Sequence, residues 1–443
     1  MDNVDQPGFD NQRSDYLSGP EAAALLGVKR ETLYAYVSRG LLRGVAGGRG
    51  RARLYLRTDL EQLKARHDAR AGHGAVAASA LRWGEPVLES ALTAIGPRGP
   101  AYRGREAVAL AREGVPFDAV AELLWTGALP EGGGAGQGRP SGQGPASAGV
   151  GVSAARLAAL LPRDTPPLPA LALAIAAMGA RDPTRHAGAP LGEEPIFTTD
   201  AELARARAIV RALAALIGLG RDAAWSSAAL GEGSTARRVL LALGARAGST
   251  RSAAAERAIN RALVVSADHE LNVSAFAVRV AASAGADLYA CVSAGLAALS
   301  GPRHGGVCDR VEALVAEAGR PERAGAAVRD RMRRGEAIAG FGHRLYPDGD
   351  PRAELLIETA RALAPRSLAV RTVLALVDEM RAAGREPPTL DMGLVALAAA
   401  AGLPPGSALA LFAVGRAAGW IAHAFEQREA GYMLRPRARY TGP

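Results

Sequence analysis

The stretch GFGHRLYPDGDPR, residues 340–352, places one histidine directly after two glycines and ends in an arginine. Gly340 and Gly342 allow the backbone before His343 to adopt conformations, or to approach a ligand, that a side chain would prevent. The DGDP sequence that follows is typical of a turn. The stretch therefore predicts a tight loop that carries His343 and Arg352. The role of these two residues depends on which other residues of the chain share their site.

Two further segments place a histidine among polar or small residues. In ADHELN, residues 267–272, His269 stands with polar neighbours at the head of an otherwise apolar helical pattern, where it can face a cleft. In GPRHGG, residues 301–306, His304 follows a glycine–proline helix break and precedes two glycines, so that a ligand can approach it closely. A single such histidine is more often structural, but three in one chain indicate a common site.

Composition limits the class of protein. The chain has 443 residues, of which 49% are hydrophobic and 22% charged, enough for two or three domains rich in helix. Its apolar runs are interrupted by Gly, Pro and Ser, which favours buried helices over membrane spans. The polar N-terminus lacks a signal-peptide pattern, and two cysteines, Cys291 and Cys308, are too few for a disulfide framework and lack metal-site spacing. We expect a soluble, cytoplasmic protein.

The N-terminal region has its own pattern. Residues 16–42, YLSGPEAAALLGVKRETLYAYVSRGLL, predict two short helices separated by a turn. Ser18 can cap the first helix and Gly27 can end it. A glycine-rich turn between short strands and a third helix are expected to follow, which makes residues 16–67 a winged helix-turn-helix domain. Residues 1–15 are polar and are predicted to be disordered.

This region resembles the helix-turn-helix heads of MerR and excisionase-type DNA-binding proteins, through AAALLGV..ETLYAYVSRGLL and RLYLRTDLEQL. Residues 27–57 include eight basic residues and one acidic residue, and this excess of positive charge suits contacts with DNA phosphates. The alternative is a docking module, or a relic that binds no DNA. The residues expected to contact DNA are Arg30, Thr32, Tyr34, Tyr36 and Arg39.

The remaining chain resembles the citrate synthase and 2-methylcitrate synthase family. ADHELN, GPRHGG, GFGHRLYPDGDPR, LDMGL and GWIAH…LRPRARYTG occur in that family's order and spacing, and AYRGREAVAL and PFDAVAELLWTGALP resemble its N-terminal half. The resemblance implies an all-α, two-domain fold, a homodimer, and closure of a large and a small helical domain over the substrates. The expected boundaries are a linker at 68–80, the synthase-like domain at 81–443, a flexible glycine-rich loop at 131–151 and the small domain at roughly 306–402.

Three matched residues would carry the chemistry of the family. His304 matches the histidine that hydrogen-bonds the acetyl-CoA thioester oxygen, and His343 matches the one that polarises the ketone of oxaloacetate. Asp391 of LDMGL matches the catalytic base. These residue types suit the reaction, because an α-proton is hard to remove unless a carboxylate base is paired with a donor to the developing enolate oxygen.

Four further matches imply substrate binding. His269 matches an oxaloacetate ligand, and Arg352 and Arg416 match arginines that bind its carboxylates, for which a guanidinium is a bidentate partner. Arg435 of LRPR matches an arginine contributed across the dimer, so each active site is expected to need both chains. No metal or redox cofactor is expected, since the coenzyme A thioester enters as a substrate.

The sequence also departs from the family. Met392 and Gly393 follow the base where an aromatic residue is common, which can widen the acyl pocket, and HGGVCDR replaces the common HGGANEA, which places Cys308 near the site. One alternative is therefore a 2-methylcitrate synthase that uses propionyl-CoA. Another is a transcription regulator whose non-catalytic synthase domain senses oxaloacetate or acyl-CoA.

Overall fold

The computed structural model contains two compact units. The first comprises Met1–Glu89 with Arg435–Pro443, and the second comprises Ser90–Leu434. The structure describes residues 16–38, 42, 44–46, 53–56, 60, 88–130, 153–186, 197–244, 250–436, 440 and 442. Three predicted segments lie outside the described residues: the tail at 1–15, the linker at 68–80 and the glycine-rich loop at 131–151.

The first unit combines helices with a small antiparallel sheet of strand order β1-β3-β2. Leu17 of the first strand pairs with Tyr55 of the third, which the sequence reasoning did not foresee. The elements are β1 (Tyr16–Ser18), α1 (Gly19–Leu26), α2 (Arg30–Ser38), β2 (Gly44–Ala46) and β3 (Arg53–Leu56).

Local chemistry explains where the first helix begins and ends. The backbone N–H and hydroxyl of Ser18 donate to the Glu21 carboxylate, at 2.9 and 2.7 Å. Gly27 ends α1 with φ of 62°, a conformation that favours glycine. Leu33 of α2 is fully buried. The two predicted helices and the two short strands expected after them are confirmed, whereas the third predicted helix lies outside the described residues except for Leu60. The buried core of this unit consists of Leu17, Ala22, Leu26, Leu33, Leu42, Tyr55 and Leu60.

The second unit begins with a three-stranded antiparallel sheet of strand order β4-β5-β6. Beyond residue 80 the sequence reasoning expected helices alone, and these short strands, joined by glycine-containing turns, gave no alternating pattern long enough to detect. Tyr102 is fully buried, and its hydroxyl donates to the carbonyl of Val264 at 2.9 Å. The sheet is therefore fixed to the helical body; its strands are β4 (Thr93–Gly96), β5 (Gly99–Tyr102) and β6 (Arg105–Glu106).

Helices make up most of the second unit, and polar side chains cap several of them. Thr199, Asp222 and Ser234 each accept a hydrogen bond from a backbone N–H in the first turn of the helix that follows. The first ten helices are α5 (Ala107–Glu113), α6 (Phe117–Thr126), α7 (Ala154–Ala158), α8 (Pro167–Arg181), α9 (Asp200–Leu216), α10 (Ala223–Leu230), α11 (Thr235–Ala242), α12 (Thr250–Ser266), α13 (Val273–Ser283) and α14 (Leu288–Leu299).

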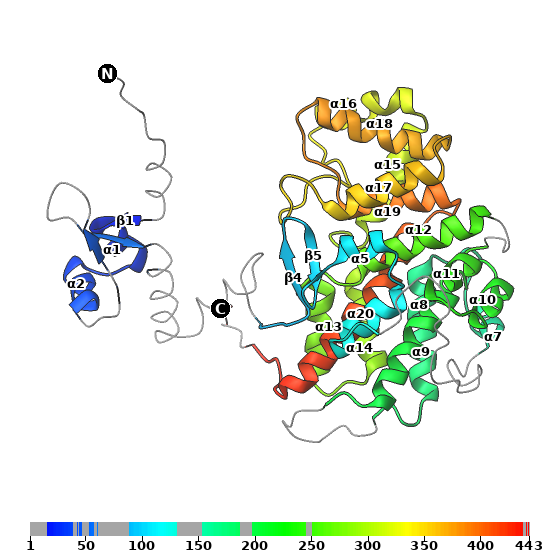
Figure 1. Cartoon of the computed structure of the whole chain (residues 1–443), viewed down its shortest axis with the longest axis horizontal. Helices are drawn as coiled ribbons and strands as arrows, with labels where there is room; N and C mark the ends of the chain where they lie inside the picture. Colours follow the sequence, from blue (N-terminus) through cyan, green and yellow to red (C-terminus); the bar gives the residue numbers. More distant parts are fainter. Residues whose placement is uncertain are drawn as a thin grey trace. The chain divides into compact units, whose positions relative to one another are not determined.

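A second group of helices gathers at one end of this unit, drawn yellow to orange in Figure 1. It spans the residues expected to form the small domain, 306–402, whose independence as a domain stays a prediction. Its members are α15 (Val307–Ala318), the 3-10 helix η1 (Pro321–Arg323), α16 (Ala324–Arg333), α17 (Pro351–Leu363), α18 (Leu368–Ala382) and α19 (Leu390–Ala401).

The last helix, α20 (Ser407–Ala430), runs through the interior of the second unit and packs against α12, α13 and α14 (Figure 1). Among the described residues it is the one helix long and apolar enough to cross a membrane, yet its apolar stretch is 94% buried inside the protein. A Cβ at Gly419 would lie 2.4 Å from the carbonyl oxygen of Ala267. Glycine therefore allows α20 to approach the segment that carries His269.

Candidate active site

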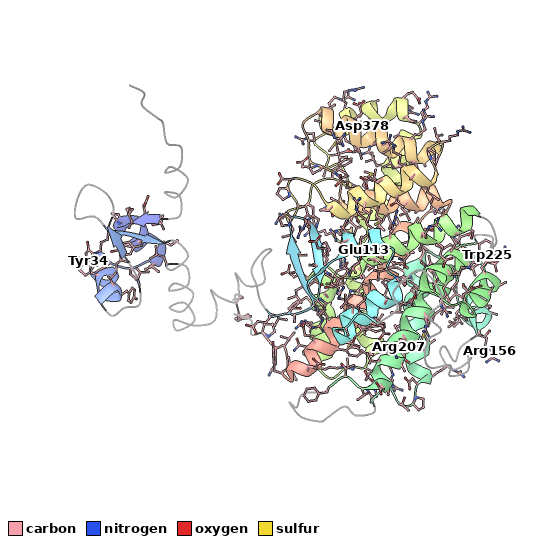
Figure 2. All side chains as sticks on the ribbon, viewed as in Figure 1. Tyr34, Glu113, Arg156, Arg207, Trp225 and Asp378 are labelled. Carbon is pink, nitrogen blue, oxygen red and sulfur yellow. The ribbon has the colours of Figure 1, made fainter. Side chains whose placement is uncertain are left out.

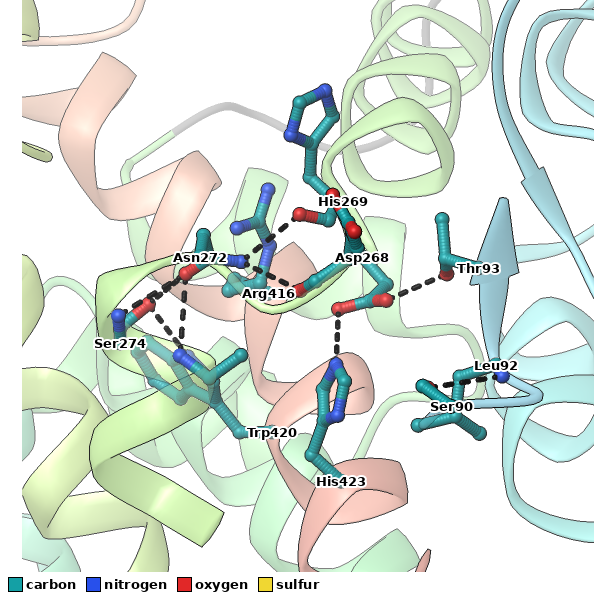
Figure 3. A network of polar contacts seen from close by, with 12 residues as sticks. Ser90, Leu92, Thr93, Asp268, His269, Asn272, Ser274, Arg416, Trp420 and His423 are labelled. Carbon is teal, nitrogen blue, oxygen red and sulfur yellow. Dashed lines mark hydrogen bonds and ion pairs between the residues drawn. The ribbon is translucent and has the colours of Figure 1, made fainter. Parts of the chain in front are cut away.

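The segment between α12 and α13 directs two neighbouring side chains in opposite directions (Figure 3). Asp268 points into the core, where it accepts a hydrogen bond from Thr93 Oγ1 at 2.6 Å and pairs with His423 Nε2 at 3.3 Å. His269 points the other way, and its Nε2 lies 2.9 Å from the hydroxyl of Tyr346. The buried pair thus fixes the backbone that presents His269.

The same network continues along α20. Arg279 donates from Nε to His423 Nδ1 at 3.2 Å, which leaves His423 Nε2 facing Asp268 Oδ1 at 3.3 Å. Arg279 also pairs with Glu426, whose carboxylate accepts the backbone N–H of Ala91 at 2.7 Å. The fully buried His423 of α20 therefore connects this helix to α13 through Arg279, and to strand β4 through Asp268 and Thr93.

The glycine loop is built as its sequence predicts. Gly340 and Gly342 have φ of 86° and 78°, in the left-handed region that favours glycine. A Cβ at Gly340 would lie 2.7 Å from a methyl carbon of Val311. The N–H of Gly342 donates to the carbonyl of Pro387 at 2.9 Å, and the N–H of Thr389 donates to that of Gly340 at 2.8 Å. The loop is thereby fastened to the segment that opens α19.

The loop brings His343 against His269. Their ring centroids lie 5.4 Å apart with the planes at 81°, and the Tyr346 ring lies 4.9 Å from that of His343. The Nδ1 atom of His343 accepts the backbone N–H of Leu345 at 3.2 Å. A neutral His343 therefore carries its hydrogen on Nε2, which is left as a donor.

Arg352 opens α17 and is 2% exposed. Its Nε and Nη2 donate to the two carboxylate oxygens of Asp350, at 2.9 and 2.8 Å. The guanidinium carbon also lies 5.3 Å from the centre of the Tyr346 ring. Although burial opposes the charged form, Asp350 raises the pKa of Arg352 above its usual value. Only Nη1 of Arg352 lacks a hydrogen bond to a described residue.

Arg416 differs from Arg352 in how its guanidinium is bonded. It is 1% exposed, and its Nε donates to the carbonyl of Ser266 at 2.9 Å, while the guanidinium carbon lies 4.8 Å from the Phe412 ring centre. Neither of its Nη groups is hydrogen-bonded to a residue that the structure describes. Burial lowers the pKa of Arg416 to about 10, so it remains charged at neutral pH. A buried charge with free donors is costly unless a ligand satisfies it.

His304 lies at the break between α14 and α15. Its Nε2 is 2.9 Å from Ser274 Oγ, which also lies 2.7 Å from the side-chain oxygen of Asn272 and accepts the Trp420 indole N–H at 3.0 Å. Its ring meets that of Phe412 edge-on, with centroids 5.8 Å apart. Phe412 therefore contacts both His304 and the guanidinium of Arg416.

Asp391 is the second residue of α19. Its Oδ1 accepts a hydrogen bond from Cys308 Sγ at 3.2 Å, and its Oδ2 accepts one from Thr389 Oγ1 at 3.2 Å. Burial raises the pKa of the Asp391 carboxyl, and these hydrogen bonds act in the opposite direction. The group is thus a more basic carboxylate than one exposed to water.

All three histidines have a pKa below the usual value for an imidazole. Burial lowers the pKa of His304 to about 4, with a further contribution from Arg416. Burial and then Arg352 lower the pKa of His269 and of His343. All three imidazoles are therefore neutral at pH 7, and each can donate one hydrogen bond. Among the described residues, no group of three or more His, Cys, Asp or Glu is arranged to hold a metal ion.

Comparison with known protein families accounts for this arrangement. Residues 80–437 match the family described as "Citrate synthase, C-terminal domain". The chain belongs to the citrate synthase family. Residues 16–68 match a helix-turn-helix domain, so this family member has a helix-turn-helix unit at its N-terminus.

Curated citrate synthases align over part or most of the chain. "Citrate synthase 2" of Bacillus subtilis is 37% identical over 189 residues, which is 42% of this chain and 51% of that protein. The chain thus spans about half the length of the first curated relatives that it matches. The citrate synthase of Mycolicibacterium smegmatis is 29% identical over 344 residues, or 77% of this chain and 88% of that protein.

Solved citrate synthases share the fold. The enzyme of Pyrobaculum aerophilum superimposes with a TM-score of 0.65 at 25% identity, covering 81% of this chain and 91% of that one. The enzyme of Thermoplasma acidophilum, in ternary complex with carboxymethyl coenzyme A and oxaloacetate, gives 0.64 at 24% identity, over 81% and 94% of the two chains. The predicted helical citrate synthase fold is therefore confirmed, with small sheets added.

The predicted site residues fall into two groups. Six lie in one connected set of contacts and charges in the second unit: His269, His304, His343, Arg352, Asp391 and Arg416. Arg435 is exposed and belongs to the first unit, outside this set. Its expected role across a dimer stays a prediction.

The predicted DNA contacts lie on or beyond α2. Tyr34 lies at the surface of the first unit (Figure 2) and is 49% exposed. Thr32 and Tyr36 are half-buried. The Tyr36 ring packs against the core of that unit, which leaves only part of it to meet a partner. The side chain of Arg30 and the whole of Arg39 lie outside the described residues.

Sequence reasoning missed several residues that shape the site. Asp350 precedes a proline–arginine pair at a helix start, a typical capping arrangement that could have singled it out. Ser274 follows the capping Asn272, and His423 lies in the recognised GWIAH motif without an assigned role. Tyr346 lies in the recognised GFGHRLYPDGDPR motif, also without an assigned role, because its contact with His269 is long-range.

Proposed function

We propose that the second unit condenses an acyl-CoA thioester with oxaloacetate, giving citrate and CoA when the acyl group is acetyl. The observation that carries this proposal is the buried Arg416, whose Nη donors are unpaired among the described residues, within electrostatic reach of Arg352 and of the neutral His269 and His304. Cations and neutral donors together favour a small dicarboxylate. Membership of the citrate synthase family supports the same substrate class.

In the first step, Asp391 removes a proton from the α-carbon of the thioester. The electron pair of that C–H bond forms a carbon–carbon double bond, and the thioester oxygen gains the charge, which a neutral His304 stabilises by donating a hydrogen bond. For His304 to donate through Nδ1, its Nε2 has to accept the hydroxyl hydrogen of Ser274. The side-chain oxygen of Asn272 then remains satisfied by two backbone N–H groups.

In the second step, the enolate carbon attacks the ketone carbon of oxaloacetate. His343 gives its Nε2 proton to the ketone oxygen, which becomes the product hydroxyl, and it regains a proton from water as Asp391 releases the one that it removed. His269, Arg352 and Arg416 hold the substrate. Water then cleaves the thioester and releases CoA. The protein side chains supply all the acid–base groups of this sequence, so we expect no metal or redox cofactor.

The assembly is part of the proposal. We infer a homodimer in which Arg435 of one chain completes the site of the other, as the family resemblance implies. The exposure of Arg435 is compatible with a contact to a second chain. We further propose that the protein acts in the cytoplasm, in the tricarboxylic acid cycle.

The acyl group is the least constrained part of the substrate. A Cβ at Gly393 would lie 3.0 Å from Leu356 Cβ and 3.1 Å from the Cα of Ala353, and Met392 is fully buried. The small residue after Met392 thus serves the close packing of α17 on α19. Acetyl-CoA is the first candidate substrate from the family resemblance, and a 2-methylcitrate synthase that takes propionyl-CoA is the second candidate.

A steady-state assay of the purified full-length chain tests the reaction. CoA release is followed with oxaloacetate and either acetyl-CoA or propionyl-CoA, and kcat/KM is compared between the two. Release with acetyl-CoA at the higher kcat/KM supports the proposal. Binding of oxaloacetate without any CoA release would instead favour a metabolite-sensing regulator.

The helix-turn-helix unit supports a second function, binding of DNA. The specific observations are the helix-turn-helix match at residues 16–68 and the excess of basic residues between 27 and 57. Such a charge balance suits contacts to phosphates. A titration with duplex DNA tests this function separately from the condensation reaction.

A further inference from the structure

The carboxylate of Asp391 meets a thiol from the neighbouring helix. Cys308 lies in the first turn of α15, is fully buried, and has its Sγ 3.2 Å from Asp391 Oδ1. Thr389 Oγ1 lies 3.2 Å from the other carboxylate oxygen. Each oxygen of Asp391 therefore has one donor, and the two donors come from different parts of the chain.

We propose that Cys308 is a positioning residue for Asp391, and that its thiol hydrogen bond orients the carboxylate toward the α-carbon of the acyl-CoA thioester. This inference rests on the proposed function, in which Asp391 is the base. Cys308 itself touches no substrate in this scheme and acts through Asp391 alone.

The direction of the hydrogen bond follows from the surroundings of the thiol. Burial, and then Asp391, raise the pKa of Cys308 well above its usual value, so the thiol keeps its hydrogen and donates it. A thiol is a weak donor. It therefore fixes one oxygen of Asp391 while withdrawing less negative charge than a hydroxyl or amide donor would.

Charged groups on three helices act on this pair. Arg352 of α17 and Arg416 of α20 interact electrostatically with Asp391, and Asp309 and Glu312 of α15 act on Cys308. Both arginines stay protonated throughout the pH range of an enzyme assay. Burial is the first cause that raises the pKa of Glu312 and of Asp309, and the Cys308 thiol is not among the causes for either carboxyl. A change specific to Cys308 variants is thus a change at Asp391.

The first test is the pH dependence of kcat/KM for the acyl-CoA substrate. Because the rate falls as Asp391 becomes protonated, Cys308→Ala should move the acid limb upward by about 0.5–1 pH unit, the worth of one ordinary hydrogen bond. Cys308→Ser keeps a donor and should leave the limb at or below that of the unmodified chain. The matched control is Cys291→Ala, the other buried cysteine, whose Sγ donates to the carbonyl of Ala286 at 3.6 Å.

A second measurement does not depend on turnover. The chain has two cysteines, so its infrared spectrum has two S–H stretching bands, and Cys308→Ala assigns them. Replacing Asp391 by Ala should move the Cys308 band to higher frequency and leave the Cys291 band in place. An unmoved Cys308 band, or an acid limb equally placed in Cys308→Ala and Cys291→Ala, would overturn this inference alone. A chain that releases no CoA from any acyl-CoA would overturn the proposed function and this inference with it.

Discussion

The carboxylate of Asp350 holds the guanidinium of Arg352 in a bidentate ion pair, at 2.9 and 2.8 Å, with both side chains buried. The same carboxylate accepts the backbone N–H of Leu390 at 3.1 Å, one residue before Asp391. Asp350 therefore joins the proposed carboxylate-binding arginine to the helix that carries the proposed base. The GFGHRLYPDGDPR and LDMGL motifs, which are separate in the sequence, are thus joined by these hydrogen bonds.

Replacing Asp350 tests this link. Asp350→Asn keeps a side chain that can cap α17 but leaves the buried Arg352 charge uncompensated, and this should lower the free energy of unfolding by about 3–5 kcal/mol. We also expect KM for oxaloacetate to rise. Urea unfolding and steady-state kinetics measure the two effects, with Asp348→Asn, an exposed neighbour in the same loop, as the matched control. Equal stabilities of the two variants would show that the ion pair adds nothing.

The proposed base can be tested by removing its charge. Asp391→Asn should reduce turnover by about 10²–10⁴-fold, the usual contribution of a positioned general base, while folding and oxaloacetate binding persist. Calorimetric binding of oxaloacetate and the rate of CoA release separate these two properties. Turnover close to that of the unmodified chain would remove Asp391 from the mechanism.

Mixing two inactive variants tests whether the active site is shared. If Arg435 completes the site of a neighbouring chain, Arg435→Ala and His343→Ala chains should regain partial activity when they form heterodimers, because one of the two sites then has both residues intact. Native mass spectrometry confirms that heterodimers are present. Heterodimers without any activity would argue that Arg435 acts within its own chain.

The neutral histidines make a prediction about stability and pH. The folded chain lowers the pKa of His304 to about 4, whereas an unfolded chain binds the proton near 6.5, so the unfolded state holds more protons between these values. The free energy of unfolding should therefore fall as the pH drops from about 6.5 to about 4. Urea unfolding across this range measures the slope, and His304→Asn should flatten it. An unchanged slope in that variant would assign the effect to other groups.

The helix-turn-helix unit should bind DNA with an affinity that falls steeply as salt concentration rises, since bound cationic side chains release counterions from phosphates. On a two-fold dimer, two such units favour a palindromic site with half-sites about one helical turn, or a multiple of it, apart. Titration against DNA from upstream of the protein's own gene, at two salt concentrations, measures this. Deleting residues 1–67 should abolish binding and spare the condensation reaction. Equal affinity for random duplex would exclude a local regulatory role.

Much of the site could be predicted because its residues lie in short motifs. His269, His304 and His343 each stand beside polar or glycine residues that mark them locally, and the positive φ of Gly340 explains why a glycine precedes the third. The N-terminal helices were equally readable, since Ser18 and Glu21 cap α1 within four residues of chain. Strand β1 was not readable, because Leu17 pairs with Tyr55 far along the chain.

The sequence alone determined the family, the helical architecture and the identity of six residues that meet in the second unit. Only the tertiary structure decided how those residues are partnered. Cys308 and Asp391 are 83 residues apart, yet their side chains meet because α15 packs on α19. Arg352 is paired, whereas the Nη donors of Arg416 have no partner among the described residues, although both are arginines at the start or middle of a helix. Such differences depend on which elements pack together, and local patterns of residues do not contain that information.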